Sequence, residues 1–410
     1  MISRWMRAAW ILLLVPVTAL AFETVDSLPF PSSGRFPAAW PGDTERRPTQ
    51  LWAYGGLMYD SNPLRRFAFE RSDTVARAGV GASHEQRVYS RQSVLLEGNV
   101  EYYHFNRFSR IDHIAYFGRA EWLWELGNDL SGTAGYTRRR RHADLGEFQT
   151  ETRIMILDEL LFASGAWRFI PDWRLIGGLE YGSIERDVQA VEVNRTTARG
   201  GLEYVTPLGN AIGVEARFTR GQAPIAETIG AAAIINDFDE TEYAATLRYR
   251  LGEQLRIAGR FGQTVRSYDQ VPGRDFSGAT YRGRVDWQVE PKLLLSFEGF
   301  REPASVIDID ASHVLRTGTL FGVSWAATYK LVFSLRWVNE HRLYEGTASV
   351  VLLGTPPRDE RLQVWRFGAG WEPQRNWQIG AGFDLGERNS NQLGRDYDYR
   401  AWMLNLRVSY

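Results

Sequence analysis

The sequence repeats a segment of about ten residues in which apolar side chains alternate with polar or small ones. Segments 173–181, 242–249 and 402–410 all follow this pattern. Successive side chains of a β-strand face opposite sides, so each segment forms a ribbon with one apolar face and one polar face. Ribbons of this length, repeated along a whole chain, are typical of a transmembrane β-barrel.

The alternation predicts an all-β chain with a single antiparallel barrel of about eighteen strands, whose ends are uncertain by a few residues. A soluble β-sandwich or propeller is the alternative, but strands this long are unusual there. The predicted strands are residues 51–60, 73–83, 91–104, 112–125, 129–138, 155–168, 173–183, 194–205, 210–220, 240–250, 255–265, 277–288, 292–301, 314–326, 330–339, 361–372, 376–386 and 399–410.

The connections between these strands alternate in length. Short turns fall at 126–128, 170–172, 206–209, 251–254, 289–291 and 373–375, and long polar links at 139–154, 184–193, 221–239, 266–276, 302–313 and 340–360. This alternation predicts short periplasmic turns and long extracellular loops, with both ends of the barrel on the periplasmic side. Tryptophans flank the short turns, where an aromatic girdle would meet the membrane boundary: Trp122, Trp124, Trp167, Trp173, Trp371 and Trp377.

The N-terminus predicts a secreted protein. Arg4 and Arg7 precede an apolar run over residues 8–20, and small residues then precede Phe22, so residues 1–21 are interpreted as a signal peptide cleaved after Ala21. Residues 22–49 carry several prolines and predict an irregular periplasmic segment, which either folds into the barrel mouth or has no role. The barrel is expected over residues 50–410 of a bacterial outer membrane.

Composition excludes several classes of function. The formal charge of −1 argues against nucleic-acid binding, and the absence of cysteine excludes disulfides and thiolate metal sites. No nucleophile elbow, phosphate loop or histidine metal motif is present, so we expect no enzyme, no cofactor and no metal site. Asp308 and Asp310 could bind calcium, but two carboxylates without a glycine turn are more often part of a solvated loop.

Charged residues on the polar faces of the strands require a water-filled interior. One interpretation is an arginine-rich wall that selects anionic or sugar-based solutes. The other is that arginines and carboxylates simply pair across strands. The candidate lumen-lining residues are Arg174, Arg199, Arg217, Arg248, Arg256, Arg260, Arg282, Arg284, Glu203, Glu215 and Glu298.

Four phrases of the sequence resemble the EpsL family, which are outer-membrane barrels encoded with exopolysaccharide loci of the exosortase (PEP-CTERM) type. These phrases are Tyr59–Pro63 (YDSNP), Trp122–Gly132 (WLWELGNDLSG), Tyr204–Asn210 (YVTPLGN) and Arg274–Tyr281 (RDFSGATY). Ser61 stands where the family pattern has a second acidic residue. The resemblance implies a role in polysaccharide secretion and brings no catalytic residues with it.

The sequence therefore predicts a barrel that exports an exopolysaccharide through a hydrated, charged lumen. Expected partners are membrane lipids, lipopolysaccharide, the polysaccharide itself, periplasmic polysaccharide-export proteins and the outer-membrane insertion machinery. One alternative is a porin-like channel for small anionic solutes, with a constriction loop folded inward from the segment 221–239. Another is a non-conducting barrel that anchors the polysaccharide machinery.

Overall fold

The computed structural model describes residues 48–89, 91–188, 191–225, 227–229, 232–270, 272–304, 313–345 and 356–410. The predicted signal peptide and nearly all of the proline-rich segment 22–49 lie outside these residues, as do Asp308 and Asp310. Within the described residues, no helix is long and apolar enough to cross a membrane.

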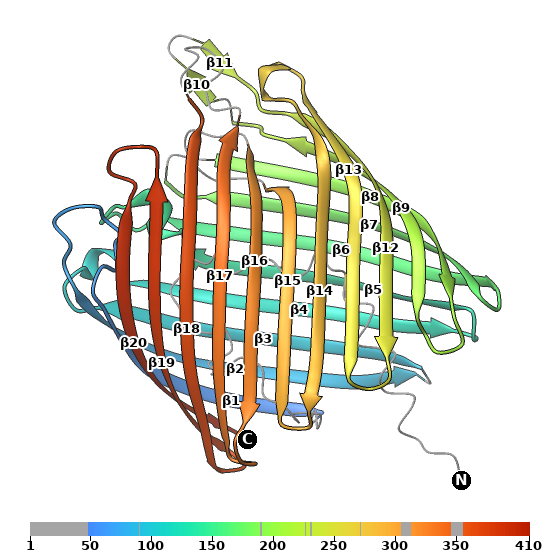
Figure 1. The fold of residues 1–410 in the computed structure, drawn as a ribbon, viewed down its shortest axis with the longest axis horizontal. Coiled ribbons are helices and arrows are strands. Elements are labelled where there is room, and N and C mark those ends of the chain that lie inside the picture. The colour runs from blue at the N-terminus through green and yellow to red at the C-terminus, as the bar shows by residue number, and fades with distance from the viewer. Residues whose placement is uncertain are drawn as a thin grey trace.

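Eighteen strands form one closed antiparallel sheet (Figure 1). β1 pairs with both β2 and β20, so the ring has no free edge. The prediction of an eighteen-strand antiparallel barrel is confirmed. The barrel strands are β1 (Thr49–Asp60), β2 (Asp73–Tyr89), β3 (Gln92–Phe105), β4 (His113–Leu126), β5 (Leu130–His142), β6 (Met155–Ile170), β7 (Trp173–Arg186), β8 (Val191–Val205), β9 (Ala211–Gln222), β12 (Phe238–Leu251), β13 (Leu255–Tyr268), β14 (Phe276–Glu290), β15 (Leu293–Ala304), β16 (His313–Ala326), β17 (Leu331–Glu345), β18 (Arg358–Gln374), β19 (Trp377–Ser390) and β20 (Tyr397–Ser409).

The described parts of the connections outside the ring contain little regular structure. β10 (Glu227–Ile229) and β11 (Ala232–Ile234) pair only with each other in the link between β9 and β12. One short helix, α1 (Leu145–Phe148), lies between β5 and β6. Single 3-10 turns, η4 (Ser109–Ile111) and η5 (Pro272–Arg274), precede β4 and β14.

Both ends of the barrel lie at the end that carries the short turns. Leu51 and Tyr410 exchange two backbone hydrogen bonds of 2.9 and 2.8 Å across the β1–β20 seam. Gly127 and Gly252, with φ of 64° and 60°, provide the left-handed backbone conformation in two of the short turns. In single-chain outer-membrane barrels the short-turn end faces the periplasm.

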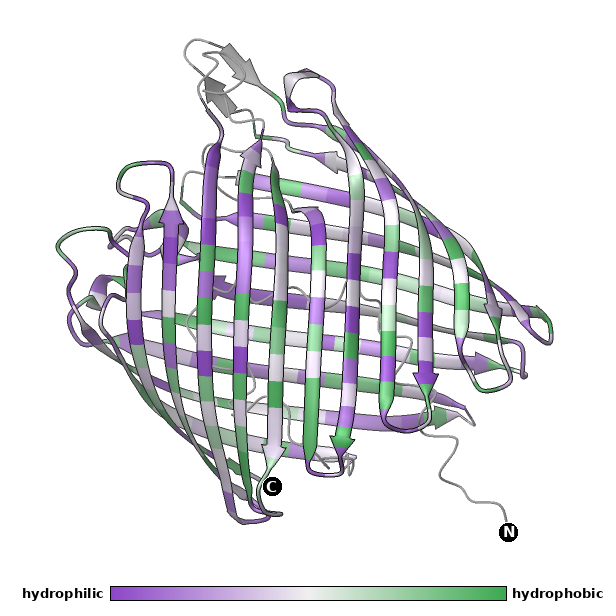
Figure 2. Cartoon of the chain, viewed as in Figure 1, coloured by the Kyte–Doolittle hydropathy of each residue, from purple (hydrophilic) through white to green (hydrophobic). Residues whose placement is uncertain are grey.

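The outer wall is apolar and carries an aromatic girdle. Along each strand hydrophobic and hydrophilic residues alternate (Figure 2). Trp122, Trp167, Trp173, Trp371 and Trp377 are exposed beside the short turns, while Trp124 is half-buried and packs against Gly132. A closed barrel with such a wall is a transmembrane β-barrel of the outer-membrane type.

A cluster of apolar side chains lies on one side of the inner wall. Buried residues of β1–β4, β15–β18 and β20 form one cluster that includes Met58, Phe105 and Leu362. Leu64, from the connection after β1, and Leu145, from α1, belong to the same cluster. The connections 61–72 and 143–154 therefore fold inward and pack against this side of the lumen.

Several strands continue beyond their predicted ends toward the long loops. β5 reaches His142 instead of residue 138, β17 reaches Glu345 instead of 339, and β18 begins at Arg358 instead of 361. Polar residues occupy both faces of these extensions, so the apolar alternation stops before the backbone pairing does. The long links are correspondingly shorter than predicted.

Gly81 of β2 offers a test of packing inside the barrel. A Cβ at this position would lie 2.4 Å from the ring of Trp52, whereas a Cβ at Gly118 of β4 would meet nothing within 4 Å. We expect Gly81→Ala to lower the free energy of unfolding by about 1–3 kcal/mol through overpacking. Denaturant unfolding in lipid vesicles, followed by tryptophan fluorescence, measures it. Gly118→Ala is the control, and equal stability of the two variants would contradict this packing.

Candidate functional site

Seven neighbouring strands, β7–β9 and β12–β15, carry the predicted lumen-lining residues on one continuous face. Cross-strand partners share a face, and the register aligns Arg174 with Glu203 and Arg260 with Arg282. Arg284 likewise lies opposite Glu298. Their strand neighbours, such as Leu175 and Phe261, are exposed on the outer wall. Successive side chains of a strand face opposite sides, so the charged side chains face the lumen. We call this surface the charged wall.

Glu203 lies between two arginines of the charged wall. Its Oε2 accepts hydrogen bonds from Arg174 Nε at 2.5 Å and from Arg248 Nη2 at 2.8 Å. The carboxylate is nearly buried, whereas 19% of the Arg174 side chain and 30% of the Arg248 side chain are exposed. One carboxylate therefore neutralises only part of the charge of the two guanidinium groups.

Glu215 has three arginines around it. The closest nitrogens of Arg199, Arg217 and Arg260 lie 3.6, 3.3 and 3.4 Å from its carboxylate oxygens. Arg260 also pairs with Glu242 at 2.6 Å. Among the described residues, the Nε atoms of all three arginines are buried without a hydrogen-bond partner. This cluster has more guanidinium donors than its carboxylates can accept.

The remaining predicted residues extend the charged wall over β13–β15. Arg282 bonds both Glu298 and Glu302, and Arg284 bonds Asp286 at 2.8 Å. Arg284 is about half exposed, at 47%, and Arg256 is exposed near the short-turn end of β13. Cross-strand pairing, one of the two interpretations of the sequence, is present. Sharing runs both ways, because Arg260 and Arg282 each bond two carboxylates. The wall residues named here comprise eight arginines and six carboxylates, which leaves a small surplus of positive charge.

A second site lies across the lumen from β5 and β6. Helix α1 begins after Asp144, whose side chain accepts a hydrogen bond from Gly146 N at 2.8 Å, an N-cap geometry. It ends at Gln149, whose φ of 48° turns the chain back. This short turn presents Glu147 to the opposite wall.

Glu147 is bound by residues of β17–β19. Its Oε1 accepts hydrogen bonds from Tyr344 OH at 2.9 Å and from Arg342 at 3.1 Å, and Arg388 lies 3.3 Å away. Its Oε2 accepts one from Arg358 at 2.7 Å. On the shorter way around the ring, β4, β3, β2, β1, β20 and β19 separate β5 from β18. The contact therefore spans the lumen, and we call it the Glu147 latch.

Backbone bonds reinforce the latch. Arg388 donates to Gly146 O at 2.7 Å, and Arg395 donates to Glu147 O at 2.6 Å. On the other side, Gln149 Nε2 donates to Arg65 O at 2.6 Å, which joins the connection 143–154 to the connection 61–72. The two inward connections therefore form one unit.

Arg65 fixes the connection that follows β1. It lies fully buried 3.5 Å above the ring of Tyr399 and donates to both oxygens of Asp60 at 2.9 and 2.8 Å. The phrase Tyr59–Pro63 therefore has a structural use here, because its acidic residue holds an arginine. Among the described residues, no cluster of three or more His, Asp or Glu could hold a metal ion.

The electrostatic setting keeps Glu147 ionised. Burial disfavours its charged form, but the guanidinium groups of Arg358, Arg388 and Arg342 outweigh that cost and hold the pKa of Glu147 well below its ordinary value of 4.5. Two further carboxylates, Glu340 and Glu360, are fully buried beside these arginines.

The sequence did not reveal the latch, and the constriction loop was expected elsewhere. The porin-like alternative expected an inward loop from the segment 221–239, parts of which lie outside the described residues. The described connection that crosses the lumen is 143–154. An N-cap residue three positions before a glutamate was the available signal. It indicates a helix start, not the wall on which the helix docks.

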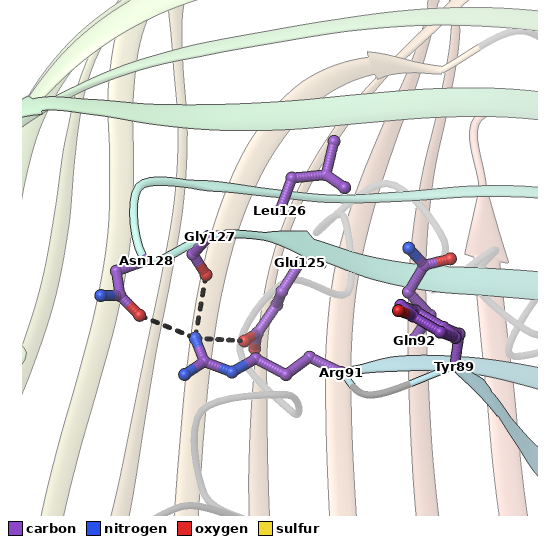
Figure 3. A pocket seen from close by; sticks show the side chains of 7 residues that line it. All are labelled: Tyr89, Arg91, Gln92, Glu125, Leu126, Gly127 and Asn128. Atoms are coloured by element: carbon purple, nitrogen blue, oxygen red, sulfur yellow. Dashed lines mark hydrogen bonds and ion pairs between the residues drawn. The ribbon is translucent and has the colours of Figure 1, made fainter.

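A separate recess of about 350 Å³ lies at the short-turn rim (Figure 3). Arg91 closes it by donating to Gly127 O and Asn128 Oδ1, both at 2.9 Å, which ties the β2–β3 turn to the β4–β5 turn. These residues lie at the rim, away from both sites described above.

Comparison with known proteins gives only distant likenesses. No model of a protein family matches the sequence, and no curated protein matches it. The solved structure of the outer membrane protein OpdK from Pseudomonas aeruginosa is similar with a TM-score of 0.49 and 9% identity, covering 88% of this chain and 99% of that one. OccK2 (OpdF) of the same organism gives 0.48 and 9%, covering 88% and 97%. The alcaligin receptor FauA from Bordetella pertussis gives 0.41 and 11%, covering 88% and 76%.

The depressed pKa of Glu147 predicts how the latch responds to acid. A carboxylate whose pKa is lower in the folded than in the unfolded protein stabilises the folded state at pH values above the unfolded-state pKa. This stabilisation is lost only as the pH falls through the folded-state pKa. We therefore expect the latch to persist between about pH 3 and pH 4. Pepsin cleavage at Leu145 and Phe148 measures whether the latch is closed. The native loop should resist cleavage, and the loop of the Glu147→Gln variant should be cut throughout this range.

Glu151→Gln is the control for this experiment. Glu151 lies in the same loop but forms only a partly exposed pair with Arg66 at 3.3 Å. It should resist pepsin like the native chain. Rapid cleavage of the native loop at about pH 4 would contradict the claim that the arginines keep Glu147 ionised.

Proposed function

We propose that this protein is a channel of the outer membrane for small solutes that carry carboxylate groups. The observation that supports the proposal is the surplus of arginines over carboxylates on the charged wall, centred on the three arginines around Glu215. Guanidinium groups bind carboxylates in a planar, two-pronged geometry, which makes them suited to this class of solute.

The pairing within the wall explains how a solute could bind without being trapped. At an effective dielectric constant near 20, an isolated pair of charges about 4 Å apart attracts by about 4 kcal/mol. The arginines around Glu203 and Glu215 already bond these carboxylates. The carboxylate of an arriving solute therefore only replaces one acceptor of a guanidinium group by another. The net gain per step is small, and successive arginines such as Arg248, Arg217 and Arg260 offer equivalent positions along the wall.

The inward loops support a small solute as the cargo. The Glu147 latch and the connection 61–72 occupy the side of the lumen formed by β1–β3 and β16–β20. We infer that the passage for a solute runs along the charged wall, which lies on the opposite side of the ring. Such a passage brings a solute within reach of the arginines, which favours selection over free diffusion.

Planar-bilayer recordings in a salt gradient test the proposal. The native channel should conduct and prefer chloride to potassium. Arg260→Gln should lower this preference by about twofold or more, and Glu215→Gln should raise it, because each change alters the net charge of the same cluster.

Arg138→Gln is the matched control for the bilayer experiment. Arg138 carries the same charge on the outer face of β5, where it pairs with Glu159 at 3.3 Å and is about half exposed. It should leave the preference unchanged. Absence of conductance would overturn the channel and support the anchoring barrel instead.

Export of an exopolysaccharide is the second candidate. The resemblance to the EpsL family implies it, and the polar, mutually paired side chains of the charged wall suit many weak contacts with a moving sugar chain. A deletion strain distinguishes the two functions. Export predicts polymer trapped in the periplasm, whereas the solute channel predicts normal surface polysaccharide and slower uptake of small carboxylates.

A further inference from the structure

The partners of Glu147 have the arrangement of a binding site for a free carboxylate. Three arginines and a tyrosine converge on one carboxylate from β17–β19, and both of its oxygens are contacted. Among the described residues, Arg316, Arg342, Arg358 and Arg388 of this cluster face Glu340 and Glu360. Arg342, Arg358 and Arg388 each pair with Glu340 or Glu360 as well as with Glu147, so the two buried carboxylates hold the three guanidinium groups in position around it.

We propose that this cluster is a carboxylate-binding site, occupied by the protein's own loop until a solute carboxylate displaces Glu147 and releases the connection 143–154. The solute class rests on the proposed function, and the cluster adds a second binding position for it, separate from the charged wall.

The geometry favours a carboxylate over a spherical anion. Arg358 bonds Oε2, while Tyr344 and Arg342 bond Oε1, so the donors are spaced for two oxygens on one carbon. The guanidinium of Arg358 also lies 3.8 Å above the Tyr344 ring, which fixes the direction of its donors. Chloride can satisfy one of these directions at a time.

The position of the cluster explains why binding would move the loop. The side chain of Glu147 is 11% exposed and those of Arg358 and Arg388 are 5% and 0% exposed, so loop and solute cannot occupy the site together. Intramolecular tethering gives Glu147 an effective concentration of the order of millimolar. Solutes above that concentration therefore compete with it.

Limited trypsin cleavage after the exposed Arg153 reports whether the loop is docked, and it needs no ion current. Glu147→Ala removes the equivalent of one acetate from the site. We expect this variant to be cleaved about tenfold faster than the native chain or more. Sodium acetate should restore the native rate, and sodium chloride at equal ionic strength should not. Equal rescue by chloride, or no rescue by acetate, would overturn the binding site.

A second experiment uses the native chain, so its outcome does not depend on whether a variant folds. Sodium acetate should speed cleavage after Arg153, and equal sodium chloride should leave it slow. Glu151→Ala, which removes a charge from the same loop but not from the cluster, should behave like the native chain. A native loop that is equally protected in acetate and chloride would overturn the competition. Bilayer selectivity can fail while these results hold, so the channel and the displaceable latch are tested separately.

Discussion

Closure of the sheet between β1 and β20 is the constraint on which the rest of the structure depends. Hydrocarbon offers no partner for a backbone N–H or C=O, so each strand must pair on both sides. The bonds between Leu51 and Tyr410 complete the ring and fix both ends at the short-turn rim. Eighteen strands then enclose a lumen too wide for side chains to fill, and its contents are set by loops and charges.

The lumen is divided between two kinds of inner wall. On β1–β4, β15–β18 and β20, apolar side chains and two inward connections pack together, and buried ion pairs such as Arg65–Asp60 fix their ends. On β7–β9 and β12–β15, partly exposed arginines and carboxylates face the remaining space. The apolar cluster thus holds the two inward connections against its own side of the lumen.

What the sequence could predict depends on how far apart in the chain the interacting residues lie. Alternation is local, so it predicted all eighteen strands and placed residues such as Arg174 and Glu203 on one face. To predict which charged residues pair across neighbouring strands, the strand register must be known. A short turn limits the possible registers to a few. The contact between Glu147 and Arg358 joins residues 211 positions apart in the sequence and from distant parts of the ring, and no local pattern encodes it. Strand ends such as His142 were missed because backbone pairing continues where apolar alternation stops.

The same pair of groups, arginine and carboxylate, occurs in both sites, but the arginines differ in burial: those around Glu203 and Glu215 are 16–30% exposed, and those around Glu147 are 0–6% exposed. In the pair Arg248–Glu203 the guanidinium is 30% exposed, so water reaches it and weakens its attraction to the carboxylate. Removing one partner from a buried cluster such as that of Glu147 costs about 3–5 kcal/mol, so it stays closed unless another anion takes its place. The proposed channel uses the first kind of pair, and the proposed displaceable latch uses the second. The division of the lumen into a wet and a packed side allows one chemistry to provide both.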